Sequence, residues 1–124
     1  MVNASDIDQY FERYGWSAAR IGAGTWQTTF RGDRATLTIE VNLTADWLLF
    51  SANLPRTGDQ VRVDHLLVAN AQMWLAKFAV DPQGRLLPRA DMPTDGFTYA
   101  HFVDCLGALS HYADVYFDEW HPGS

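Results

Sequence analysis

Residues 36–54 read TLTIEVNLTADWLLFSANL, and apolar and polar side chains alternate along most of this stretch. Alternation with a period of two predicts a strand that has one covered and one open face. Residues 44–46 interrupt the pattern and predict a turn between a strand at 34–43 and a strand at 47–54. The covered face of this pair is expected to carry Leu37, Ile39, Val41 and Leu43 from the first strand and Leu48, Phe50, Ala52 and Leu54 from the second.

The segments before residue 34 extend this hairpin into a meander and add a helix. Glycines at 22 and 24 separate a short strand from a second strand at 25–31, and a turn at 32–33 leads into the next strand. Nearer the N-terminus, Ser5 suits the N-cap of a helix whose apolar residues recur at helical spacing until Gly15. We therefore expect one helix followed by four antiparallel strands.

The next part of the chain predicts a second helix and a further hairpin. After a polar loop at 55–62, Asp64 suits the N-cap of a helix that runs to about Leu75. The sequence DPQG at 81–84 is typical of a type I turn between strands at 78–80 and 85–92. Because proline cannot donate to a ladder, Pro88 predicts an edge strand or an irregularity.

A last helix is expected over about 97–119, with Thr94 or Asp95 as its N-cap. The order of elements, α-β-β-β-β-α-β-β-α, predicts a two-layer α+β fold in which helices pack on an antiparallel sheet. At this length we expect a single domain spanning residues 1–124. At 100° per residue, one face of the last helix would carry Phe102, Cys105, Leu106, Leu109, Ala113, Tyr116 and Trp120.

The composition is that of a packed globular domain, because 48% of the residues are hydrophobic and only 19% are charged. The single Cys105 excludes an internal disulfide and a multi-cysteine zinc site. The first residues have neither the basic start nor the apolar core of a secretory signal, and no apolar run is long enough to span a membrane. We therefore expect a cytoplasmic protein with no membrane partner.

The formal net charge of −6 comes entirely from the last 35 residues, which contain six acidic residues and no Lys or Arg. Such an end repels phosphate, so we expect no nucleic-acid partner. The acidic residues of the last helix, Asp104, Asp114 and Asp118, allow two interpretations. They are either a solvated face or a docking surface for a basic partner protein.

No catalytic constellation stands out in the sequence. The chain has no phosphate-binding loop, no dinucleotide fingerprint and no nucleophile elbow. His111 and Asp114 could share a metal at a spacing of three residues, but a zinc site needs three or four ligands. Cys105 lies on the inward face of its helix, where a thiol acts as a small hydrophobe. We expect no enzyme activity, no catalytic residue, no metal and no cofactor.

The helix expected at 64–75 is apolar on nearly every side. Such a helix needs cover on more than one side, which either a second chain or the surrounding sheet and loops could supply. The candidate residues for self-association or client contact are Leu67, Ala71, Met73 and Trp74. Trp47 and Leu49, which would project from the far face of the sheet, form a second candidate patch.

Two segments carry a family resemblance: LLVAN at 66–70 and KFAVDPQGRLLPRADMP at 77–93. They resemble the YbjN-like family of putative bacterial sensory transduction regulators, which shares a fold with the class I type III secretion chaperones. The resemblance implies a non-enzymatic domain, often a homodimer, with exposed apolar grooves; the secretion chaperones hold a client segment in such grooves.

Our leading hypothesis is a homodimeric chaperone-like module that sequesters apolar segments of a partner protein. The alternative is a regulatory protein that docks a basic partner through Asp104, Asp114 and Asp118.

Overall fold

The computed structural model describes residues 1–54, 56 and 60–121. The predicted order of helices and strands is confirmed, and one short helix follows the last long one. The elements are α1 (Ala4–Tyr14), β1 (Ala18–Gly22), β2 (Thr25–Arg31), β3 (Thr36–Leu43), β4 (Trp47–Asn53), α2 (Val63–Gln72), β5 (Lys77–Val80), β6 (Leu86–Pro93), α3 (Tyr99–Val115) and α4 (Phe117–Trp120).

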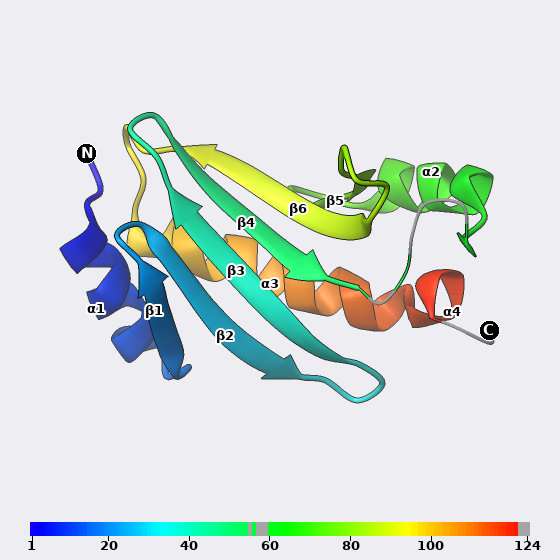
Figure 1. Ribbon diagram of the computed structural model, residues 1–124, viewed down its shortest axis with the longest axis horizontal. Coiled ribbons are helices and arrows are strands. Elements are labelled where there is room, and N and C mark those ends of the chain that lie inside the picture. The colour runs from blue at the N-terminus through cyan, green and yellow to red at the C-terminus, as the bar shows by residue number, and fades with distance from the viewer. Residues whose placement is uncertain (55, 57–59, 122–124) are drawn as a thin grey trace.

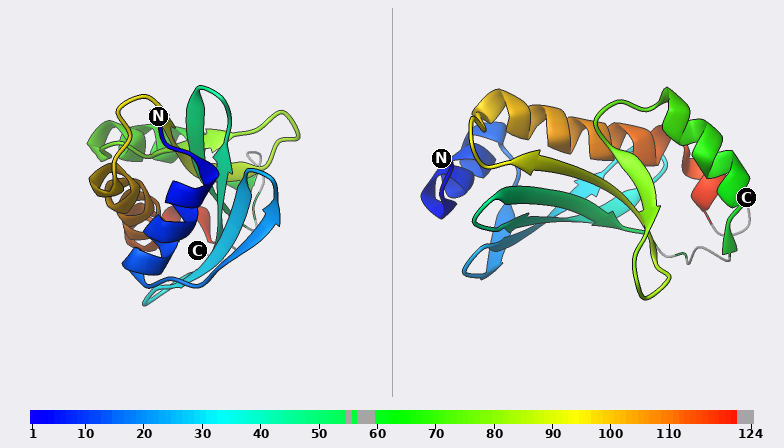
Figure 2. Two further views of the ribbon diagram at one scale, coloured as in Figure 1. Left: turned by 90° about the vertical axis from the view of Figure 1, so that its left-hand side faces the viewer. Right: turned by 90° about the horizontal axis from the view of Figure 1, so that it is seen from above.

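The strands form one antiparallel sheet in the order β1-β2-β3-β4-β6-β5. Helix α3 lies across one face of this sheet, and the two layers are seen edge-on in the right panel of Figure 2. Helix α1 lies beside the first half of α3, whereas α2 lies at the other end of the molecule next to β5 (Figure 1). Among the described residues, no helix is both long and apolar enough to cross a membrane.

The core lies between the sheet and α3, as the alternation in β3 and β4 predicts. Seven of the eight residues expected on the covered face are buried, and Leu43 is half-buried at the end of β3. The inward face of α3 also agrees with the prediction, except that Tyr116 is half-buried. The buried side chains that α3 and α4 contribute are Phe102, Cys105, Leu106, Leu109, Ala113 and Trp120.

Three predicted N-caps are wrong. Helix α1 is capped by Asn3, because Asn3 and Asp6 exchange side-chain and backbone hydrogen bonds in a capping box. The same device places the cap of α3 at Thr98, which pairs with His101. The N-cap of α2 is Arg62, which has no side-chain capping bond.

The residues that the sequence predicted as N-caps have other roles in the structure. Ser5 lies inside α1, and Asp64 lies in the first turn of α2, where its carboxylate binds the Arg62 guanidinium. Thr94 is buried, and its hydroxyl donates to the Ala45 carbonyl instead of capping α3. Part of the predicted loop at 55–62, namely residues 55 and 57–59, lies outside the described residues.

Strand β6 is an interior strand, although Pro88 suggested an edge or an irregularity. It pairs with β5 on one side and β4 on the other. The ladder with β4 ends at the pair Ser51–Arg89, immediately before the position where Pro88 would have to donate. The turn at 81–84 is confirmed: the Asp81 carboxylate accepts the N–H groups of Gln83 and Arg85, and Gly84 has a φ of 80°.

Candidate protein-binding surface

Helix α2 lies at one end of the molecule (Figure 1), and its surface from Leu66 onward is apolar and contains no charged residue. Leu66 and Ala69 are buried, but Leu67 is 62% exposed and Val68 is 67% exposed. Ala71 is exposed on the same helix, and no charged residue occurs between residues 66 and 76. We call Leu67, Val68 and Ala71 the α2 face. The helix is therefore not sunk between the sheet and the loops, the other arrangement that the sequence allowed.

The position of α2 is fixed by polar contacts at both ends. The Asn70 side chain accepts the Phe78 N–H at 2.8 Å and donates to the Phe78 carbonyl at 3.1 Å, as a neighbouring strand would do. The Lys77 ammonium donates to the carbonyls of Asn70 and Met73, which lie at the end of the helix. At the helix start, His65 Nδ1 lies 3.2 Å from a carboxylate oxygen of Glu119.

The helix ends at Gln72, three residues earlier than predicted, and a tight corner follows. Leu75 has a φ of 72°, the left-handed region that a leucine rarely adopts. Next to it, Trp74 is 81% exposed, and its backbone N–H donates to the Tyr112 hydroxyl at 2.9 Å. The corner turns Met73 inward, where it is 3% exposed. Met73 is thus a core residue and not the surface contact that we expected.

The corner forms one wall of a groove against α3, with a volume of about 410 Å³. The floor contains Gly107 and Ala108, whose small side groups leave room between Trp74 and the helix. We call this hollow the Trp74 groove. Its lining consists of Trp74, Leu75, Asp104, Gly107, Ala108, His111 and Tyr112.

Trp47 and Leu49 project from the face of the sheet opposite α3, as predicted from their alternation. Trp47 pairs with Pro93 and is 49% exposed, whereas Leu49 pairs with Asn42 and Asp91 and is half-buried. Strand β4 begins at the end of the sheet that is remote from α2 (Figure 1). This patch is therefore separate from the α2 face.

The three acidic residues of the candidate docking face have different surroundings. Asp114 accepts the backbone N–H of Arg34 at 2.9 Å, and Asp118 forms an ion pair with the Arg34 guanidinium, which also lies 4.6 Å from the Phe117 ring centre. These contacts attach the β2–β3 turn to the C-terminal helices. Asp104 is exposed at the Trp74 groove and has no ion pair within the described part of the chain.

The residues considered for chemistry lie apart. No group of three potential metal ligands occurs among the residues that the structure describes. His111 lies at the Trp74 groove, while the Asp114 carboxylate is occupied by Arg34. Cys105 is fully buried, and burial, together with the negative charges of Asp104 and Asp91, raises the pKa of its thiol to about 12. The thiol is therefore protonated at neutral pH, consistent with its expected place in the core.

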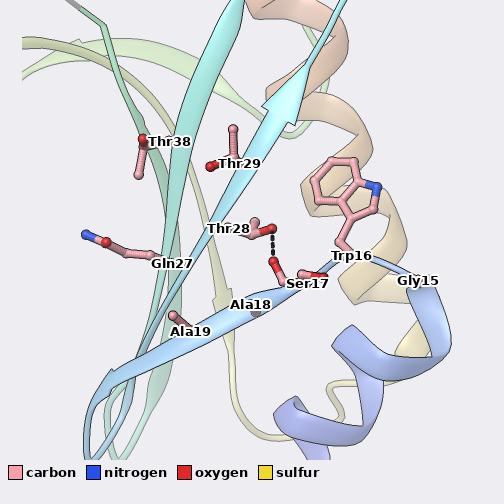
Figure 3. Close-up of a pocket in the computed structure, with 9 residues that line it drawn as sticks. All are labelled: Gly15, Trp16, Ser17, Ala18, Ala19, Gln27, Thr28, Thr29 and Thr38. Carbon is pink, nitrogen blue, oxygen red and sulfur yellow. Dashed lines mark hydrogen bonds between the residues drawn. The ribbon is translucent and has the colours of Figure 1, made fainter.

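A larger hollow, about 680 Å³ in volume, opens where β1 begins to pair with β2 (Figure 3). The Thr28 hydroxyl points toward the chain before β1 and donates to the Ser17 carbonyl at 2.7 Å. The other side chains around the hollow include Trp16, Gln27, Thr29 and Thr38. None of the lining residues is an acid, base or nucleophilic thiol, so this hollow suggests no catalytic site.

Comparisons with known proteins give a family and a fold. Residues 3–122 match the family model of YbjN, described as a putative bacterial sensory transduction regulator. The comparison with curated proteins gives no match. These results confirm the resemblance that the segments at 66–70 and 77–93 indicated.

Solved structures with the same fold include one from a type III secretion system. The chain is similar to one in the heterodimeric ExoU–SpcU complex of Pseudomonas aeruginosa, with 16% identity, a TM-score of 0.70, and coverage of 94% of this chain and 98% of that one. The ExsC–ExsE complex gives 17% identity, a TM-score of 0.66, and coverage of 99% and 100%. The HopA1–SchA chaperone–effector complex gives 12% identity, a TM-score of 0.66, and coverage of 95% and 99%. The predicted chaperone-like fold is thereby confirmed.

Proposed function

Because the chain belongs to the YbjN family, we propose that it is a non-enzymatic, chaperone-like module that forms a homodimer and sequesters apolar segments of a partner protein. The family and the fold neighbours both point to a protein-binding fold without enzymatic activity. Two of the similar structures are a heterodimeric complex and a chaperone–effector complex, which supports a protein partner. The proposal includes a cytoplasmic location.

One observation carries the proposal: the α2 face is exposed, apolar and free of charge. Leu67 and Val68 together leave two large aliphatic side chains in water on a helix that Asn70 and Lys77 hold rigidly. Burial of such side chains in a contact is favourable in proportion to the apolar area removed from water. Because α2 has no charged residue from Leu66 to its end at Gln72, the α2 face itself brings no like charges together when two copies meet.

The dimer is tested with Leu67→Asp. We expect the wild-type protein to have twice the mass of one chain in multi-angle light scattering, and the variant to have the mass of one chain, because a buried unpaired carboxylate is costly. Ile21→Asp is the matched control, since Ile21 is 54% exposed on the edge strand β1, remote from α2. A wild-type protein that stays monomeric at high concentration would contradict the proposed dimer.

Client binding is tested with a permanently unfolded protein, reduced and carboxymethylated α-lactalbumin. We expect the wild-type chain to form a complex with it in size-exclusion chromatography, and this complex to persist at high salt because apolar contacts are not screened. Trp47→Ser measures the contribution of the second patch, formed by Trp47 and Leu49. If no complex forms under any condition, sequestration of apolar segments is refuted.

The alternative function, docking of a basic partner protein through the acidic residues, has less support. Asp114 and Asp118 both contact Arg34, so a basic partner would have to compete with Arg34 for these two carboxylates. Asp104 is the acid that remains available, and its place at the Trp74 groove gives it a different role.

A further inference from the structure

The Trp74 groove combines an exposed aromatic side chain with a rigid backbone. Trp74 is 81% exposed and Leu75 is 42% exposed, although both residues belong to a corner held by hydrogen bonds. The Trp74 N–H binds the Tyr112 hydroxyl, and the Ala76 N–H binds the Trp74 carbonyl at 2.8 Å. An aromatic side chain on a fixed backbone loses little conformational freedom on binding, so it is suited to anchor a contact.

The corner also contains backbone strain at the same place. Leu75 adopts a positive φ, for which glycine is the usual residue, and it lines the groove with its side chain. Unfavourable backbone conformations that persist in a fold are often found at binding sites. Here the strained residue supplies part of the apolar wall that faces α3.

The charge at the groove has a definite sign. Asp104 is exposed on the α3 side, and the sequence from residue 90 onward contains no Lys or Arg to neutralise it. The groove lining contains no Lys or Arg, and its other polar side chains are those of His111 and Tyr112. A carboxylate beside an apolar hollow favours a ligand in which a cation adjoins an apolar side chain.

We propose that the Trp74 groove binds a partner segment in which an apolar side chain enters between Trp74 and α3 while a neighbouring Lys or Arg pairs with Asp104. This inference rests on the proposed function and specifies the chemistry of the client. The α2 face is assigned to the second copy of the chain, and the Trp74 groove to the client.

The probe is a fluorescein-labelled twelve-residue peptide of alternating Leu and Lys with Gly-Ser ends, compared with the same peptide carrying Glu for Lys. We expect fluorescence anisotropy to show at least about tenfold tighter binding of the Lys peptide. Trp74→Ala should weaken this binding about tenfold or more, as the loss of an anchoring aromatic does. Asp104→Asn should weaken it about two- to fivefold, the range for an exposed ion pair.

Two control variants test whether peptide binding depends on the groove itself or only on the net charge and the exposed apolar side chains of the protein. Asp95→Asn makes the same charge change at an exposed site before α3, and Ile21→Ala truncates an exposed aliphatic side chain on β1. Both should bind the Lys peptide as the wild-type protein does. Equal weakening by Asp95→Asn and Asp104→Asn would overturn the inference, because the attraction would then come from net charge alone.

Light scattering of every variant distinguishes this inference from the proposed function. If the wild-type protein dimerises and binds the unfolded client, but Trp74→Ala and Asp104→Asn bind the Lys peptide normally, only the groove assignment fails. If Trp74→Ala turns the dimer into a monomer, the groove belongs to the contact between copies and the assignment to a client is overturned. If the wild-type protein neither dimerises nor binds an unfolded client, the proposed function itself fails.

Discussion

The amide of Asn70 is the contact on which the position of α2 most depends. It accepts the Phe78 N–H and donates to the Phe78 carbonyl, so a single side chain satisfies both outward groups of one β5 residue. Asn70→Ala removes both hydrogen bonds. Each contributes about 1 kcal/mol net, and a partly buried backbone group left without a partner adds to the loss. We therefore expect the free energy of unfolding to fall by about 2–3 kcal/mol.

The measurement is urea unfolding followed by far-UV circular dichroism, with a thermal melt in parallel. For a chain of this length, the expected loss lowers the melting temperature by roughly 10 °C. Gln72→Ala is the control, because Gln72 is exposed on the same helix and forms no side-chain hydrogen bond among the described residues. Asn70→Asp should be intermediate, since it keeps the acceptor for the Phe78 N–H and loses the donor. If Asn70→Ala unfolds at the same midpoint as Gln72→Ala, the reasoning is refuted.

Three further predictions concern the core and the hairpins. Gly24→Ala should lower stability by about 1–3 kcal/mol because its Cβ would lie 2.7 Å from the Leu43 carbonyl oxygen, whereas Gly22→Ala, with 3.8 Å to its nearest neighbour, should melt like the wild-type protein. Arg34→Ala should lower the melting temperature more than Arg31→Ala, since the Arg34 guanidinium pairs with Asp118 and lies over the Phe117 ring of α4, and Arg31 forms no such contact within the described residues. The raised pKa of Cys105 means that the unfolded chain ionises first, so unfolding free energy should fall by up to about 1.4 kcal/mol per pH unit between pH 9 and 12. Cys105→Ala should lack this component in urea titrations at each pH, and an identical slope would contradict the assignment.

The sheet was largely predictable because its information is local. Alternation in 36–54 identifies both faces of β3 and β4, and glycines or Asp-Pro-x-Gly mark the turns. The caps were less predictable, because Ser5 and Thr94 are as suitable by type as Asn3 and Thr98. Reciprocal contacts with Asp6 and His101 decide between them.

The candidate surface was predictable only in part. The apolar character of α2 left two kinds of cover open, a second chain or the surrounding sheet and loops, and only the exposure of Leu67 and Val68 argues against the second. The end of the helix was placed too late because neither Trp74 nor Leu75 is a helix-breaking residue. The partner of Asp114 and Asp118 could not be identified from the sequence, because Arg34 lies 80 and 84 residues away from them. Contacts between residues so far apart in the sequence form only in the folded chain, and they leave no periodic pattern in the sequence.

Because α3 lies near the end of the chain, the ribosome translates it after the sheet that it covers. All six strands are translated before Tyr99, so the apolar side of the sheet lacks the cover that α3 supplies until this helix has left the ribosome. During that interval the nascent chain exposes side chains such as Ile39, Phe50 and Leu86, which are fully or almost fully buried at the end of folding. A protein that we propose to cover apolar segments of other proteins therefore exposes apolar side chains of its own during its synthesis.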